Sequence, residues 1–118
     1  MKTPKSLIAG RDVYAIQKNM TVHEAALYMT SKHVGAVPVL DGTRLVGIFS
    51  ERDVITRVVA RESEPKTTKV EDVMTKELVT AKPGTSLEEA QQILHKNKVE
   101  KLLLVGDDGR LAGLITIK

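Results

Sequence analysis

Ser50 and Asp53 stand three residues apart in the run Ser50-Glu51-Arg52-Asp53, directly after an apolar stretch. A hydroxyl and a carboxylate at this spacing predict a helix start, where each side chain caps the backbone of the other residue. The same two groups, with the free N–H groups of the first helical turn, are also able to bind phosphate or hydroxyl oxygens of a ligand. The four residues alone favour the helix cap.

Other kinds of reactive site find little support in the sequence. The chain has no cysteine, which removes disulfides, thiolate metal sites and a thiol nucleophile. Its histidines, His23, His33 and His95, are too scattered to indicate a metal site. No glycine-rich phosphate loop occurs, and no nucleophile has a partnered base. We therefore expect no catalytic residues, no metal, no obligatory cofactor and no enzymatic activity.

Composition limits the size of the fold and the class of partner. With 118 residues, of which 42% are hydrophobic and 28% charged, the chain forms one compact domain or two half-size units that share a core. The net charge of +3 is dispersed and aromatic residues are only 3%, so nucleic-acid binding ranks last. No run approaches the about 18 apolar residues of a membrane span, and the N-terminus does not read as a secretory signal. We expect a cytoplasmic location and no membrane contact.

The chain contains an internal repeat. A shift of 65 residues places Val22 on Leu87, and it also places Val34, Val37 and Val39 on Val99, Leu102 and Leu104. With one residue inserted at a turn, 45–50 then falls on 111–116. This agreement in the apolar pattern indicates two copies of one structural unit.

Each copy reads as strand, helix, strand, strand, helix. Thr21 with Glu24, and Ser86 with Glu89, form capping-box patterns before the first helix. Two apolar strands then flank a turn that contains Asp-Gly, which is a strong hairpin signal. The predicted elements are strands 14–17, 36–40 and 45–49 with helices 22–32 and 51–60 in the first copy, and strands 78–81, 101–105 and 111–115 with helix 87–97 in the second.

A polar segment, 61–69, separates the copies, and Thr68 with Glu71 predicts a short helix over 70–74. We assign 1–61 to an N-terminal segment and the first repeat, 62–76 to the linker with its short helix, and 77–118 to the second repeat. About 55 residues are marginal for independent folding. We therefore expect an α/β (α+β) fold in which the two sheets pack on each other.

At this point two stretches of the first copy carry a likeness to a known family. Val34-Gly35-Ala36-Val37-Pro38-Val39, followed by 45–53, resembles the CBS domain, and Val70-Glu71-Asp72-Val73-Met74-Thr75 is similar to the linker that introduces a second copy. The likeness extends over about 11–118. The first repeat looks like small stand-alone CBS-pair proteins, and the second, over 99–105 and 113–118, is similar to the CBS insert of inosine-monophosphate dehydrogenase.

The resemblance implies a Bateman module, in which a pseudo-two-fold axis relates two CBS repeats. Such modules bind AMP, ADP, ATP, NAD or S-adenosylmethionine in their clefts, regulate an attached or partner protein and commonly form homodimers. Here the regulated protein is unknown.

The resemblance also implies site residues. The carboxylate of Asp53 would accept hydrogen bonds from both ribose hydroxyls, and Ser50 would meet ribose or phosphate oxygens. The phosphate could also be met by Arg52, Arg11, Lys101, Arg110, His33 or Lys118, each of which is otherwise an ordinary surface charge. The base pocket would be lined by Gly35, Ala36, Val37 and Pro38, completed by Ala15 and Ile16. Equally, 35–38 reads as a helix-to-strand turn with a proline at a sheet edge.

The second repeat departs from this pattern. Glu100 stands in the place of Gly35, and Leu103 in the place of Pro38. Thr116 matches Ser50, but the printed sequence stops before the positions of Asp53 and the following helix. We therefore expect apolar strand surface that a partner could cover, and at most one competent nucleotide site per chain. The weaker second site would consist of Thr80, Lys101, Leu102 and Thr116.

Three functions follow, in order of preference. The first is a regulatory module that binds an adenosine-containing nucleotide. The second is a structural dimerisation or assembly module that needs no ligand. The third is nucleic-acid binding.

Overall fold

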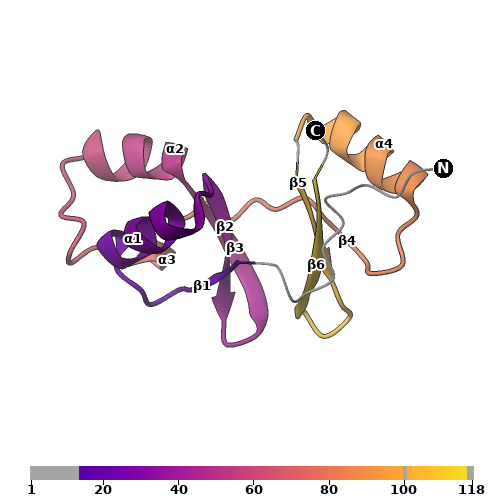
Figure 1. Cartoon of the computed structure of the whole chain (residues 1–118), viewed down its shortest axis with the longest axis horizontal. Coiled ribbons are helices and arrows are strands. Elements are labelled where there is room, and N and C mark those ends of the chain that lie inside the picture. Colours follow the sequence, from indigo (N-terminus) through magenta and orange to yellow (C-terminus); the bar gives the residue numbers. More distant parts are fainter. Residues whose placement is uncertain (1–13, 100, 117–118) are drawn as a thin grey trace. The chain divides into compact units, whose positions relative to one another are not determined.

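The computed structural model describes residues 14–99 and 101–116 of the chain. The chain divides into two compact units, one formed by Tyr14–Glu77 and another that contains Leu78–Lys118. Each has a three-stranded sheet with helix packed on one side (Figure 1). Within the described residues, no helix has the length and apolar character needed to cross a membrane.

The first unit carries its helices on one face of the sheet (Figure 1). Strand order is β1-β2-β3, with β1 parallel and β3 antiparallel to the middle strand β2. The elements in chain order are β1 (Ile16–Gln17), α1 (Val22–Lys32), β2 (Ala36–Asp41), β3 (Arg44–Ser50), α2 (Glu51–Asp53), the π-helix η1 (Val54–Val59) and α3 (Val70–Val73).

The core of this unit is mainly aliphatic, with Phe49 as its fully buried aromatic side chain. Its largest fully buried side chains include Phe49 from β3, Ile16 from β1 and Val22 from α1. The predicted capping box at the start of α1 is confirmed: Glu24 N–H donates to Thr21 Oγ1 at 3.1 Å, and Thr21 N–H donates to Glu24 Oε1 at 2.9 Å. Packing on the sheet and a closed helix end thus fix α1 beside β2.

Pro38 does not lie in an edge strand, as the sequence had allowed, because β2 is the middle strand. It pairs with Ile48, whose N–H and C=O both bond Thr75 and so point away from β2. In such a non-hydrogen-bonded pair the nitrogen of Pro38 also points away from β3. On the opposite edge of β2, β1 pairs only with Val39 and Leu40. Pro38 therefore costs the sheet no backbone hydrogen bond.

Two helix predictions need correction. The helix expected over 51–60 is present, but from Val54 to Val59 it has π geometry, and Ala60 N–H bonds Ile55 C=O at 2.9 Å. The capping box predicted from Thr68 and Glu71 is wrong, because α3 begins after Lys69 with no side-chain cap. Backbone carbonyls of the β1–α1 loop accept from the first N–H groups of α3 instead. Val70 N–H donates to Met20 C=O at 2.9 Å, and Glu71 N–H donates to Lys18 C=O at 3.1 Å.

The second unit repeats this scaffold. It contains β4 (Thr80–Ala81), α4 (Leu87–Asn97), β5 (Lys101–Val105) and β6 (Leu111–Thr116), with strand order β4-β5-β6 and the same parallel and antiparallel pairings. Its core includes Ala90, Leu94, Leu102 and Ile115. The register shift after Leu104 reproduces the one after Val39 in the first unit, and Val39 and Leu104 are partners in the sequence repeat. The repeat therefore holds even at an irregularity of the hairpin.

Candidate functional site

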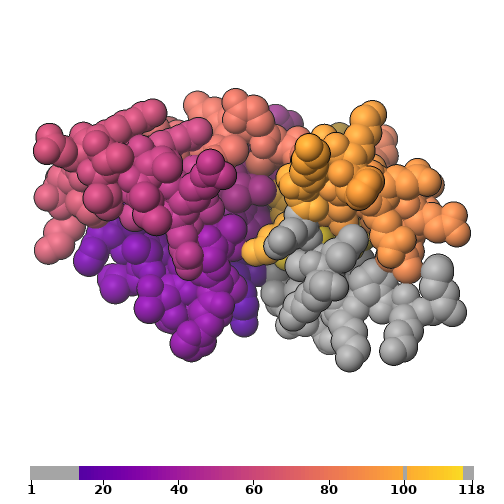
Figure 2. All heavy atoms as spheres, turned by 90° about the horizontal axis from the view of Figure 1, so that it is seen from above, coloured from indigo at the N-terminus to yellow at the C-terminus, as the bar shows by residue number. Residues whose placement is uncertain are grey.

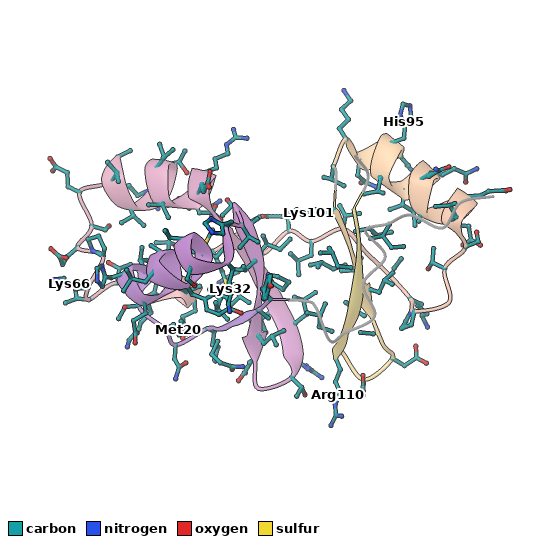
Figure 3. The ribbon with its side chains drawn as sticks, viewed as in Figure 1. Met20, Lys32, Lys66, His95, Lys101 and Arg110 are labelled. Atoms are coloured by element: carbon teal, nitrogen blue, oxygen red, sulfur yellow. The ribbon has the colours of Figure 1, made fainter. Side chains whose placement is uncertain are left out.

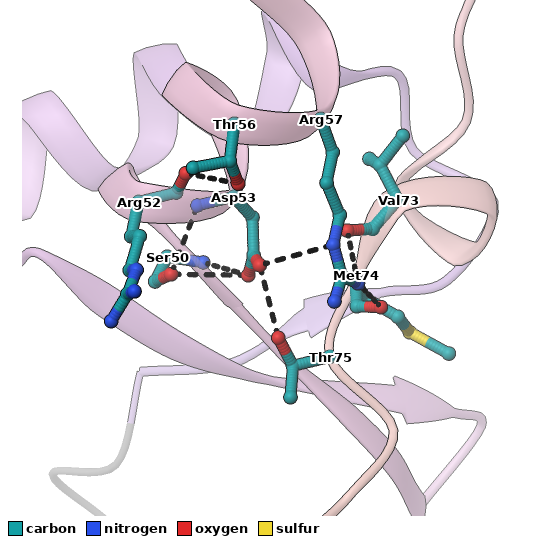
Figure 4. Close-up of polar contacts among 8 residues, drawn as sticks. All are labelled: Ser50, Arg52, Asp53, Thr56, Arg57, Val73, Met74 and Thr75. Carbon is teal, nitrogen blue, oxygen red and sulfur yellow. Dashed lines mark hydrogen bonds and ion pairs between the residues drawn. The ribbon is translucent and has the colours of Figure 1, made fainter.

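Ser50 is the last residue of β3 and the N-cap of α2. The candidate site therefore lies where β3 ends and α2 begins. Its Oγ accepts from Asp53 N–H at 3.2 Å, while Asp53 Oδ2 accepts from Ser50 N–H at 2.9 Å and from Ser50 Oγ–H at 3.0 Å (Figure 4). The helix cap that the four residues favour is thus present. Asp53 is only 4% exposed, which is rare for a carboxylate without fixed partners.

The second carboxylate oxygen of Asp53 lies close to two further side chains, those of Thr75 and Arg57. Oδ1 accepts from Thr75 Oγ1–H at 2.9 Å and lies 4.0 Å from Arg57 Nε. Arg57 Nη1 donates to the carbonyls of Val73 at 3.2 Å and Met74 at 2.7 Å, at the end of α3 (Figure 4). Ser50, Asp53, Arg57 and Thr75 form one polar network, which we call the Asp53 cluster.

Neither Arg57 nor Thr75 is predicted as a site residue from the sequence. Arg57 carries a signal that could have been used, since it lies four residues after Asp53, the spacing at which helical side chains meet. Thr75 carries none, because it is 22 residues from Asp53 and contacts it only through the fold.

The segment after α3, which we call the connector (Met74–Glu77), is attached to the outer edge of β3. Thr75 N–H donates to Ile48 C=O at 2.8 Å, and Ile48 N–H donates to Thr75 C=O at 2.9 Å. Next to this bridge, Met74 fills the space that a side chain at Gly47 would occupy: a Cβ there would lie 2.6 Å from Met74 Sδ. The chain enters the second unit directly after Glu77.

Two of the residues expected at the base pocket, Gly35 and Ala36, lie beside Ser50 and Glu51. Ala36 and Ser50 are register partners, and Glu51 N–H donates to Gly35 C=O at 2.9 Å. The side chains of Ile16, Val37 and Pro38 are buried, whereas Ala15 and Ala36 are half-buried and Gly35 is exposed. A base at this edge would therefore meet backbone groups and small side chains.

A pocket of about 590 Å³ lies between α1 and the helix formed by α2 and η1. In the space-filling view of Figure 2, the magenta atoms of α2 and η1 lie next to the indigo and violet atoms of α1. The lining is mainly apolar, with Met29 and Ile55, and its charged or polar members include His33 and Glu51. Gly35 and His33 are predicted site residues that line the pocket, whereas Asp53 does not line it.

The basic residues expected near phosphate do not gather at one point. Arg52 is exposed, and its side chain points away from the Asp53 cluster (Figure 4). Arg110 lies at the turn of the β5–β6 hairpin and bonds Asp108 at 3.4 Å, whereas Lys101 begins β5 at the other end (Figure 3). His33 ends α1 with a φ of 56°. Arg11 and Lys118 lie outside the described residues.

The candidate second site has the same strand register as the first. Lys101 pairs with Thr116, as Ala36 pairs with Ser50, and Thr80 pairs with Leu103. Leu102 is fully buried in the core of its unit and Lys101 is exposed. Glu100 and the side chain of Thr116 lie outside the described residues. Among the described residues, no group of three His, Asp or Glu side chains is arranged to hold a metal ion.

Comparison with known proteins assigns the family. The CBS domain family matches this chain twice, over residues 6–60 and 70–118. An inosine-5'-monophosphate dehydrogenase of Nitrosopumilus maritimus (strain SCM1) is 42% identical over 106 residues, which cover 89% of this chain and 21% of that protein. The chain thus spans about a fifth of the length of such relatives.

Two solved structures resemble this fold closely. A protein with CBS domains from Burkholderia ambifaria MC40-6 gives a TM-score of 0.75 at 36% identity, over 91% of this chain and 78% of that one. CBSX2 in complex with AMP gives a TM-score of 0.79 at 25% identity, over 94% of this chain and 86% of that one. The chain therefore belongs to the CBS-domain family, and it carries two CBS domains in tandem, a pairing that forms a regulatory module.

Proposed function

We propose that the first repeat binds an adenosine-containing nucleotide (AMP, ADP, ATP, NAD or S-adenosylmethionine), and that the chain regulates another protein without catalysing a reaction itself. The observation that carries the proposal is the position of the Ser50–Asp53 helix start beside 35–38, through the Ala36–Ser50 register and the Glu51–Gly35 bond. AMP in the similar CBSX2 supports the ligand class. A cytoplasmic location fits the absence of cysteine.

Each part of the nucleotide would meet a different group. The ribose hydroxyls would donate to the carboxylate of Asp53, and bonds to a charged acceptor are worth about 1.5–3 kcal/mol each. Phosphate oxygens would meet Ser50 and the first helical N–H groups, with Arg52 able to turn toward them. The base would lie against Gly35, Ala36 and Ala15, read by backbone groups of 35–38. The weaker second site, at Thr80, Lys101, Leu102 and Thr116, has Glu100 and Leu103 in the places of Gly35 and Pro38, so we propose that the first repeat is the main nucleotide site.

Calorimetric titration of the full chain with AMP, ATP, NAD and S-adenosylmethionine tests this function. We expect binding of at least one of them, and Asp53→Asn should weaken it about tenfold or more, because one lost charged hydrogen bond of 1.5–3 kcal/mol corresponds to about that factor. Thr21→Ala is the matched control, since it removes an equivalent helix cap outside the site. Absence of heat and of any rise in melting temperature with all four compounds would refute the proposal.

A second function, assembly without ligand, is favoured by one observation. Leu27 on α1 and Ile55 and Val59 on η1 are 59%, 63% and 65% exposed. A second copy of the chain that covered these side chains would give the homodimer expected from the resemblance. A stable dimer with flat nucleotide titrations would favour this reading over the regulatory one.

A further inference from the structure

The Asp53 carboxylate belongs to the candidate ligand site and to the connector at the same time. Thr75 donates its hydroxyl to Asp53 Oδ1 at 2.9 Å, and only Lys76 and Glu77 separate Thr75 from the second unit. Whatever changes the partners of Asp53 therefore acts on the segment that joins the two repeats.

The number of acceptor positions on Asp53 limits what can bind there together. A carboxylate offers about four lone-pair positions. Oδ2 accepts from Ser50 N–H and Ser50 Oγ–H, and Oδ1 accepts from Thr75, with Arg57 Nε 4.0 Å away. Two ribose hydroxyls need two positions, and at most one is left. A ribose that uses both hydroxyls must displace one of the internal donors.

Thr75 is the donor most easily displaced. The N–H of Ser50 is fixed by the helix start, and its hydroxyl also accepts from Asp53 N–H at 3.2 Å. Thr75 is half-buried and comes from a separate segment, so its hydroxyl can turn to solvent. The Ile48 bridge and the Arg57 bonds to Val73 and Met74 would still hold the connector, so displacement loosens it without detaching it.

We infer that Thr75 and the nucleotide compete for Asp53. Ligand binding in the first repeat then breaks the hydrogen bond from the Thr75 hydroxyl to Asp53, which we call the latch, and loosens the connector to the second repeat. This inference rests on the proposed function. Coupling of this kind is reciprocal: if the ligand weakens the latch, a weakened latch must strengthen ligand binding.

AMP titration of the unmodified chain and of Thr75→Val tests the competition. Valine keeps the shape and the strand preference but has no hydroxyl, and we expect it to bind AMP about five- to tenfold more tightly, at the lower end of typical coupling. Thr75→Ser, which keeps the hydroxyl, should bind like the unmodified chain. Thr56→Val is the matched control, because it removes a hydroxyl bond to Arg52 C=O on the same helix and leaves Asp53 untouched.

Each outcome decides the matter. Equal or weaker AMP binding by Thr75→Val overturns the latch and leaves the proposed function standing, since Thr75 would then be inert or would position Asp53. Failure of the unmodified chain to bind any of AMP, ATP, NAD and S-adenosylmethionine overturns both together. If one of the other three binds and AMP does not, that compound replaces AMP in the test. Should Thr75→Val not fold, hydrogen exchange on the unmodified chain is the second measurement: AMP should speed exchange of the Ile48 and Thr75 amides, and unchanged or slower exchange would contradict the latch.

Discussion

Gly47 shows how a single residue can hold the connector in place. A Cβ at this position would meet Met74 Sδ at 2.6 Å and the carbonyl oxygen of Thr75 at 3.0 Å. The flexible Met74 side chain can move aside, but the Thr75 carbonyl is part of the bridge to Ile48 and cannot move without weakening it. The close approach of the connector to β3 therefore depends on glycine at 47.

Gly47→Ala should lower the free energy of unfolding by about 1–3 kcal/mol, the usual cost of forcing an extra methyl group into a packed site. Chemical denaturation followed by circular dichroism measures the change. Gly84→Ala is the matched control, because no atom lies within 4 Å of the added Cβ, and it should change stability by less than about 0.5 kcal/mol. Equal stability of the two variants would show that the connector does not pack on β3 in solution.

For single residues, the sequence predicts the contact between Ser50 and Asp53, which are neighbours in the chain, and not the contact between Asp53 and the distant Thr75. The cap between Ser50 and Asp53 follows from a spacing of three residues, and it is present. That Thr75 completes the cluster could not be predicted, because only the packing of α3 against β3 and η1 brings it there. The ribose role of Asp53 stays a prediction.

The helices and hairpins are the elements that sequence patterns predict best. Both 11-residue helices, α1 and α4, have the predicted bounds, since the capping residue and the apolar period fix each of them locally. The opening strands are shorter than predicted, two residues each, because β1 pairs only with Val39 and Leu40, and β4 only with Leu103 and Leu104. Where an element depends on distant partners, as α3 depends on Met20 and Lys18, local patterns fail.

The capping box of α1 gives a pH prediction. Hydrogen bonds from the backbone and hydroxyl of Thr21 hold the pKa of Glu24 below its ordinary value. Because the pKa is lowered in the folded chain, the cap stabilises α1 fully above the ordinary carboxyl pKa, and this contribution is lost as the pH falls through the lowered value.

Carboxyl NMR titration measures the effect directly. Thr21→Ala removes the hydroxyl bond and should move the pKa of Glu24 part of the way back, since the bond from Thr21 N–H can remain. Glu24→Gln should abolish the acid-dependent loss of amide protection in α1, while Glu88→Gln, in the first turn of α4, serves as the control. A Glu24 pKa at or above the ordinary value would contradict the cap.

Across the whole molecule, the two repeats share a scaffold but differ in the groups that they expose. Strand order, register and the irregularity in the hairpin recur, because the apolar pattern that determines them is duplicated. In the first unit, α2 and η1 follow the hairpin and carry the Asp53 cluster and the exposed side chains of Ile55 and Val59. The proposed ligand binding and the proposed association of copies thus depend on the same helix.

The proposed homodimer can be tested at that helix. Ile55 is 63% exposed and lines the pocket between α1 and η1, so a second copy seated there would bury it. Ile55→Lys should weaken dimerisation about tenfold or more, because it replaces an apolar contact worth about 1.5–3 kcal/mol with a charge. Light scattering over a range of concentrations measures this, with Thr43→Lys at the β2–β3 turn as the charge-matched control. A dimer that withstands Ile55→Lys would place the interface elsewhere.

The same variant also tests whether association depends on the ligand. If Ile55→Lys weakens only the ligand-free dimer and AMP restores it, the shared helix couples association to binding, as expected when a ligand favours one of two states.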